Sequence, residues 1–165
     1  MAHRFTVNST IQGVSIDEFK RLASDTALHE AVCRRIPGEK LEIIESKIQG
    51  DTYTLRRAYN LDVKIPDIAK KLIKDAFRLK RTDITNLEAL TSTIELGANL
   101  PLHANCERSV TGDDLQIHIT LNWQVKIKVP LIAGMLEKHA EGEIRKFSDL
   151  EIQIVEDELK KNRSA

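Results

Sequence analysis

Alternating apolar and polar residues between Leu115 and Val129 predict a long β-strand with one buried and one exposed face. A period of two this regular is typical of an antiparallel sheet that is covered on one side only. Burial of large apolar side chains, at roughly 1.5–3 kcal/mol each, fixes the register of such a strand. The apolar positions all share one parity: Leu115, Ile117, Ile119, Leu121, Trp123, Val125, Ile127 and Val129.

A long amphipathic helix is predicted directly after this strand, over about residues 131–161. Pro130 suits the first turn of a helix, because its missing N–H would have no helical partner there. The helix would be roughly 45 Å long and the strand roughly 50 Å, so we expect the helix to lie along the whole sheet. Its apolar stripe consists of Ile132, Leu136, Ala140, Phe147, Leu150 and Ile154.

Two short helices are expected after a first strand at about residues 3–11. Ser15-x-x-Glu18 forms a capping box at the start of the first helix. Asp25 or Thr26 caps the second helix, which Pro37-Gly38 ends. Strands then resume.

The middle of the chain predicts further strands and one more short helix. Ile65-Pro66-Asp67 opens that helix, which we expect to end near Phe77. Turn dipeptides at Gly50-Asp51 and Gly112-Asp113 indicate hairpins. The strands are expected at about residues 41–48, 52–63, 80–90, 92–99 and 102–110. Segregated strands and helices indicate an α+β fold.

Composition narrows the function classes. The chain has 165 residues, long enough for one domain with its own core, so we expect a single domain over residues 1–165. Its 25 basic and 25 acidic residues cancel, which argues against nucleic acid or an anionic membrane surface as a partner. No apolar signal-peptide core follows Met1, and the longest uncharged run, Leu96 to Cys106, is too short and polar to span a bilayer.

The two cysteines, Cys33 and Cys106, are isolated from each other and from other metal-ligating residues. Such cysteines are typical of free buried thiols in a reducing cytoplasm. We therefore expect a cytoplasmic protein with no metal and no cofactor.

Arg57 is the most informative single residue. The parity of the 52–63 strand places it on the apolar face, together with Tyr53, Leu55 and Tyr59. An unpaired charge in an apolar interior is very costly, so Arg57 must be paired, reach solvent or line a wet cavity. Glu143 of the long helix is a candidate partner across such a cavity.

His139 and Glu143 lie four residues apart at the middle of the helix stripe. A histidine facing a cavity can act as an acid or base near neutral pH. A lone histidine on an apolar stripe is more often a structural residue. The i, i+4 spacing of His139 and Glu143 also suits half of a metal site, but the sequence names no further ligands for it. Trp123 and Phe147 are expected on the same inward surface, where ordinary core packing is the alternative role.

The order of elements resembles the START-like, or SRPBCC, helix-grip fold, also called Bet v 1-like. The match is carried by Arg4-Phe5-Thr6-Val7, by Ile65-Pro66 and by the run from Val129 to Lys138, and it is closest to a bacterial branch without an assigned activity. The resemblance implies a curved seven-stranded antiparallel sheet around a long C-terminal helix, with a cavity between them. The superfamily includes lipid carriers, hormone receptors and polyketide cyclases, so the fold alone does not give the function.

The favoured hypothesis is a carrier, sensor or chaperone that binds a small hydrophobic or lipid-like molecule, without catalysis. Arg57 would orient a polar head group, and apolar side chains would cover the body of the ligand. One alternative is a cyclase- or hydrolase-type enzyme that uses His139 and Glu143; another is a protein-interaction module with a filled core. The sequence leaves the oligomeric state open. The expected ligand-binding residues are Tyr53, Leu55, Arg57, Tyr59, Trp123, His139, Glu143 and Phe147.

Overall fold

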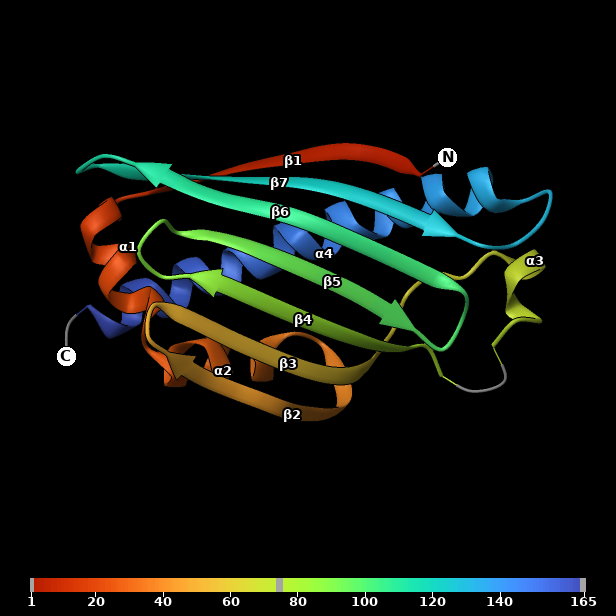
Figure 1. The fold of residues 1–165 in the computed structure, drawn as a ribbon, viewed down its shortest axis with the longest axis horizontal. Helices are drawn as coiled ribbons and strands as arrows, with labels where there is room; N and C mark the ends of the chain where they lie inside the picture. The colour runs from red at the N-terminus through yellow and green to blue at the C-terminus, as the bar shows by residue number, and fades with distance from the viewer. Residues whose placement is uncertain (1, 74–75, 164–165) are drawn as a thin grey trace.

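The computed structural model describes residues 2–73 and 76–163. Within these residues, seven strands form one antiparallel sheet with the order β1-β7-β6-β5-β4-β3-β2. The strands are β1 (His3–Gln12), β2 (Gly38–Gln49), β3 (Thr52–Leu61), β4 (Arg78–Asn86), β5 (Thr91–Ala98), β6 (Leu102–Gly112) and β7 (Gln116–Ile127). The helices are α1 (Ile16–Ala23), α2 (Thr26–Arg35), α3 (Asp67–Lys70) and α4 (Ala133–Asn162). The predicted α+β class and the seven-stranded helix-grip architecture are confirmed (Figure 1).

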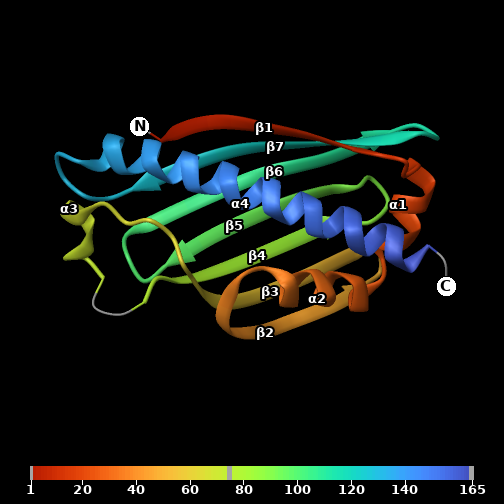
Figure 2. The same ribbon diagram turned by 180° about the vertical axis from the view of Figure 1, so that it is seen from behind.

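The α4 helix crosses the concave face of the curved sheet diagonally (Figure 2). It begins beside β1 and β7 and ends near α1 and α2. At its start, the buried carboxylate of Glu137 accepts a hydrogen bond from the Ile127 amide at 2.9 Å. At its end, Arg163 donates to both carboxylate oxygens of Glu18, and Arg35 pairs with Glu158 at 3.2 Å. Polar contacts therefore fix both ends of α4 over the sheet.

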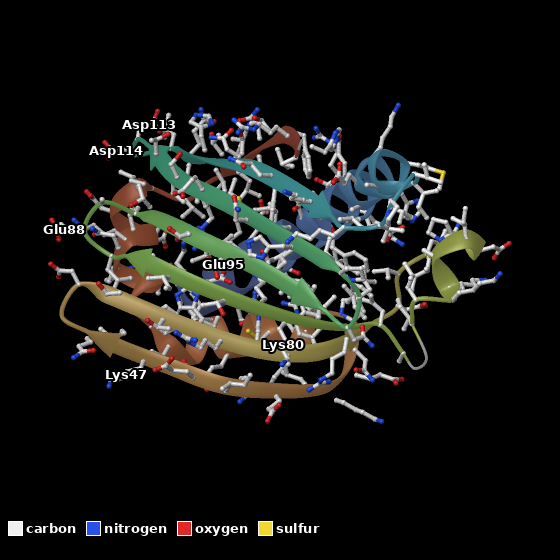
Figure 3. All side chains as sticks on the ribbon, turned by 45° about the vertical axis from the view of Figure 1, so that its right-hand side comes forward. Lys47, Lys80, Glu88, Glu95, Asp113 and Asp114 are labelled. Carbon is white, nitrogen blue, oxygen red and sulfur yellow. The ribbon has the colours of Figure 1, made fainter. Side chains whose placement is uncertain are left out.

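The expected faces of the strands are present. In β7, every second residue from Ile117 to Ile127 is buried. In β4, the inward parity carries Leu79, Arg81, Asp83 and Thr85, so charged groups lie among apolar neighbours. Lys80 of β4 and Glu95 of β5 lie on the opposite, convex face, which is covered with charged side chains (Figure 3).

The short N-terminal helices begin where the capping residues predict. The Ser15 hydroxyl accepts the Glu18 amide at 3.0 Å, which satisfies one of the free N–H groups of α1. The Asp25 carboxylate accepts the Ala27 amide at 3.0 Å at the start of α2. Cys33 and Cys106 are free and buried, as expected, and burial raises the pKa of the Cys106 thiol to about 12.

Several predicted boundaries are wrong; the strand expected at about residues 80–90, for example, spans Arg78–Asn86. Leu115 belongs to the turn before β7, because its amide donates to the Asp113 carboxylate at 2.8 Å, and it is therefore exposed. The long helix begins at Ala133 and not directly after Pro130. Leu131 has a left-handed backbone with φ of 73°, which is incompatible with a right-handed helix at that position. The middle helix spans only Asp67–Lys70, and residues 74 and 75 of its predicted range lie outside the described residues.

No described helix combines the length and apolar character needed to cross a bilayer.

Candidate functional site

A cavity of about 160 Å³ lies between the sheet and the N-terminal half of α4. Its wall is largely apolar, because β3, β4, β5 and β7 direct their inward residues toward it and α4 covers it with its apolar stripe. The closing segment, residues 63–72 of the connection between β3 and β4, covers one end together with Phe77. Central lining residues are Tyr59, Leu79, Leu96, Trp123, Leu136, Ala140, Glu143 and Phe147, with Val63, Pro66 and Ala69 from the closing segment.

His139 fastens this closing segment to α4. Its Nε2 lies 2.5 Å from the Lys64 carbonyl oxygen. A carbonyl can only accept, so Nε2 carries the proton and donates it. The nitrogen that faces the segment is therefore engaged in a structural contact at the edge of the cavity.

Two polar atoms at the first cavity have no partner among the described residues. They are the indole Nε1 of Trp123, a donor, and Oε2 of Glu143, an acceptor, and both are buried. A buried polar group without a hydrogen bond costs about 1–3 kcal/mol. Tyr59 also lines this cavity, and burial raises the pKa of its hydroxyl, so the side chain stays a neutral phenol. The cavity thus offers an apolar wall with a few polar positions.

A second cavity, of about 90 Å³, lies under the C-terminal half of α4. Helices α1 and α2 contribute Phe19, Leu28 and His29, and the sheet contributes the inward residues of β3 to β7. Arg81, Ser148 and Glu151 line both cavities, so they form the boundary between them. The two cavities together follow the path of α4 across the sheet.

The boundary is a network of ion pairs. Arg81 binds Asp83 through two parallel contacts, Nε–Oδ1 at 2.8 Å and Nη2–Oδ2 at 2.9 Å. Arg81 Nη1 also contacts Glu151 Oε1 at 2.9 Å, and Arg57 Nη2 contacts the same oxygen at 3.5 Å. Bidentate guanidinium–carboxylate contacts are among the strongest polar contacts in proteins and fix the planes of both groups.

The carboxylates of this network are ionised. Burial alone would raise the pKa of Asp83, but Arg81 and Arg57 outweigh it and hold that pKa well below its usual range. The same balance lowers the pKa of Glu151: burial opposes ionisation, and Arg81 and Arg57 favour it more strongly. Asp83 and Glu151 therefore each carry a negative charge at neutral pH.

The remaining guanidinium contacts are weaker. Arg57 is only 3% exposed and donates through Nη1 to the Cys33 sulfur. Burial raises the pKa of Cys33 against the opposing effect of Arg57, so the group is a thiol and adds no charge. Arg108 Nη2 donates to the Ser92 hydroxyl at 2.7 Å and more weakly to Thr85 at 3.4 Å.

The eight expected ligand-binding residues all line a cavity, but they divide between two. Five line the first cavity: Tyr59, Trp123, His139, Glu143 and Phe147. Three line the second: Tyr53, Leu55 and Arg57.

The expected pairing of Arg57 with Glu143 is wrong, because Glu151 takes that place. Glu151 follows Glu143 by eight residues, about 12 Å along the helix. Because α4 crosses the sheet diagonally, the part of the helix that lies near Arg57 of β3 is the part that carries Glu151.

Four further charged residues of the site were not predicted from the sequence: Arg81, Asp83, Arg108 and Glu151. Parity with Leu79 could have placed Arg81 and Asp83 on the inner face of β4. Arg81 is also the direct register partner of Arg57, and like charges opposite each other in a sheet require nearby acids. The spacing of Glu151 four residues after Phe147 is the corresponding signal on α4.

The curved seven-stranded sheet and the long α4 helix form a START-like, or helix-grip, fold. Three solved structures share this fold: TTHA0849 from Thermus thermophilus (TM-score 0.67, 12% identity, 98% of this chain and 99% of that chain), the Zhui aromatase/cyclase from Streptomyces sp. R1128 (TM-score 0.63, 15% identity, 96% and 94%), and a START superfamily protein from Mycobacterium smegmatis (TM-score 0.57, 14% identity, 94% and 97%). At such low identity the likeness shows the fold alone. No curated protein matches the chain. The chain belongs to the family described as Protein of unknown function (DUF2505), whose model matches residues 6–158.

Proposed function

We propose that the protein binds a small, largely apolar molecule in the first cavity, beneath the N-terminal half of α4. The observation that carries this proposal is the cavity of about 160 Å³ with its largely apolar wall. Ligand sites are concave and mostly apolar, with a few polar groups that fix orientation. Empty apolar volume lowers stability, so a protein that keeps it gains when a ligand fills it.

The unpaired atoms of Trp123 and Glu143 support a ligand with one polar group. The indole N–H can donate to a ligand oxygen, and the free Glu143 oxygen can accept from a ligand hydroxyl. Either contact would remove a buried unsatisfied group and orient the molecule in the cavity. A small alcohol or phenol with an apolar body has this chemistry.

Other observations favour binding over the two alternatives. His139 donates through Nε2 to a backbone carbonyl, and no contact joins it to Glu143 in the described part of the chain, so the geometry supports a structural role for His139. A protein-interaction module with a filled core would leave no room under α4, whereas two cavities lie there.

Fluorescence of Trp123 offers a direct test, because it is the only tryptophan of the chain and lines the first cavity. Titration with 1-alkanols from butanol to decanol should change its emission in a saturable way, with affinity rising as the chain lengthens and then levelling off when the cavity is full. A linear change without saturation for every alkanol would contradict the proposal.

Two matched variants show whether the response comes from the cavity. Ala140→Phe places a ring in the first cavity and should weaken alkanol binding at least tenfold. Lys138→Phe introduces the same side chain at an exposed position of α4 and should leave the affinity unchanged. Equal affinity in the two variants would count against the first cavity as the site.

A further inference from the structure

The second cavity contains more positive than negative charge. Three guanidinium groups, those of Arg57, Arg81 and Arg108, line it together with two carboxylates, those of Asp83 and Glu151. Three positive charges against two negative ones leave one positive charge. His29 adds none at neutral pH, because burial lowers its pKa and its Nε2 donates to the Ala23 carbonyl at 2.6 Å. No other charged residue lines the cavity within the described chain.

The unbalanced positive charge of the second cavity belongs to Arg108. Arg81 has Asp83 and Glu151 as partners, and Arg57 shares Glu151. In the described part of the chain, Arg108 forms no ion pair, and its hydrogen-bond partners are the neutral hydroxyls of Ser92 and Thr85. Burial, together with Arg81, lowers the pKa of Arg108 and outweighs the opposing attraction of Asp83 and Glu151, neither of which is in ion-pair contact with it.

Two buried N–H groups at this cavity also lack acceptors. They are Nε of Arg57, in a side chain that is only 3% exposed, and Nε of Arg108. A buried charge with unsatisfied donors is costly, and a protein tolerates it where an anion completes the set. An anion that accepts hydrogen bonds from these two N–H groups would therefore complete the site.

We propose that the second cavity binds a monocarboxylate, with Arg108 as its direct partner. One negative charge balances the excess, whereas a phosphate dianion would overcompensate it. A planar carboxylate also matches the two parallel N–H groups of a guanidinium. A water needs about 10–15 Å³ of such space, so 90 Å³ has room for a carboxylate and a short chain.

The carboxylate could belong to either of two molecules. The first is an amphipathic acid whose apolar body passes the boundary residue Ser148 into the first cavity, and this case rests on the proposed function. The second is a free small organic acid that occupies the second cavity alone. Both place the same group against Arg108.

Isothermal titration calorimetry with three probes at neutral pH tests the proposal: octanoate, 1-octanol and acetate. We expect octanoate to bind the wild-type protein at least tenfold more tightly than 1-octanol, which has a similar body without the charge. Arg108→Gln should abolish this preference. Arg56→Gln removes an exposed guanidinium that pairs with Glu45 on the outer face of β3, and it should keep the preference intact.

A cooperative thermal unfolding transition is the check that each variant is folded. Arg108→Gln should not lower the midpoint, because it removes a buried charge without an anionic partner. Arg108→Lys keeps the charge but loses the planar pair of donors, so it should retain a reduced preference for octanoate. If Arg108→Gln does not fold, Arg108→Lys decides the question: a reduced or absent preference for octanoate supports the carboxylate site, and an unchanged preference overturns it.

The three probes separate the two proposals. Acetate binding that depends on Arg108 would identify a free acid, and octanoate binding without acetate binding would identify an amphipathic one; both support the carboxylate site. Equal affinity for octanoate and 1-octanol would overturn the carboxylate site and leave the apolar ligand in place. Arg108-dependent acetate binding without any 1-octanol binding would overturn the apolar ligand of the first cavity and leave the carboxylate site in place. Failure of all three probes would overturn both.

Discussion

Glu151 holds two guanidinium groups at once. Its Oε1 lies 2.9 Å from Arg81 and 3.5 Å from Arg57, and its side chain is 20% exposed. Without it, Arg57 would lose its ion-pair partner and Arg81 would keep Asp83 alone. The position of Arg57 on the inner face of β3 could be predicted from strand parity, because parity fixes direction. Its partner could not, since the choice of acid depends on where a diagonal helix passes over the strand.

Glu151→Gln should lower the free energy of unfolding by about 3 kcal/mol at neutral pH. Removal of one partner from a buried ion pair costs about 3–5 kcal/mol, and the partial exposure of Glu151 favours the lower end. Urea unfolding followed by circular dichroism measures the difference. Glu156→Gln is the matched control on the same helix: its pair with Lys160 is partly exposed, so its effect should stay below about 0.5 kcal/mol.

The difference between wild type and Glu151→Gln should also depend on pH. The pKa of Glu151 is lower in the folded protein than its ordinary value of 4.5. The stabilisation from its charge is therefore complete above that value and is lost as the pH falls toward the folded-state pKa. A difference that stays constant from neutral pH down into this acid range would contradict the assigned ion pairs.

Among the elements, the strands and the capped helices could be predicted closely from sequence, because their signals are local. The alternation in β7 and the capping residues Ser15 and Asp25 act within a few residues. The short α3 could not be predicted in this way. Its apolar Ile68 is exposed, and the neighbouring Val63 and Pro66 line the first cavity outside the helix.

The closing segment between β3 and β4 should respond to loss of its contact with α4. His139→Ala removes the hydrogen bond to the Lys64 carbonyl, so amides of residues 63–72 should exchange with solvent several-fold faster. Hydrogen exchange with mass spectrometry measures this. The Trp123 titration should show faster association and dissociation of 1-octanol with an affinity that changes less than the rates.

His118→Ala is the control for this element. His118 lies on the outer face of β7 and contacts Thr10, far from the closing segment in the sequence. It should leave the exchange of residues 63–72 unchanged. Identical exchange of this segment in His139→Ala and wild type would show that the His139 contact does not hold it in place.

For the whole molecule, the sequence predicted one continuous cavity, whereas the described structure contains two cavities with an ionic boundary. The sequence pattern alone predicted eight side chains on the inner surface, because strand parity and helix period determine the face on which each side chain lies. The pattern could not assign these side chains to two separate cavities. That assignment depends on contacts between β4 and α4, such as the one between Arg81 and Glu151, which are 70 residues apart in the sequence. Long-range contacts of this kind are absent from local sequence patterns.

The most direct test of a ligand between sheet and helix is the set of intermolecular nuclear Overhauser effects between 1-octanol and isotope-labelled protein. We predict contacts from the alkyl chain to the rings of Trp123 and Phe147 and to the methyl groups of Leu136, all at the first cavity. Contacts confined to exposed apolar residues such as Leu131, Met135 and Leu115, with none to the cavity residues, would contradict it.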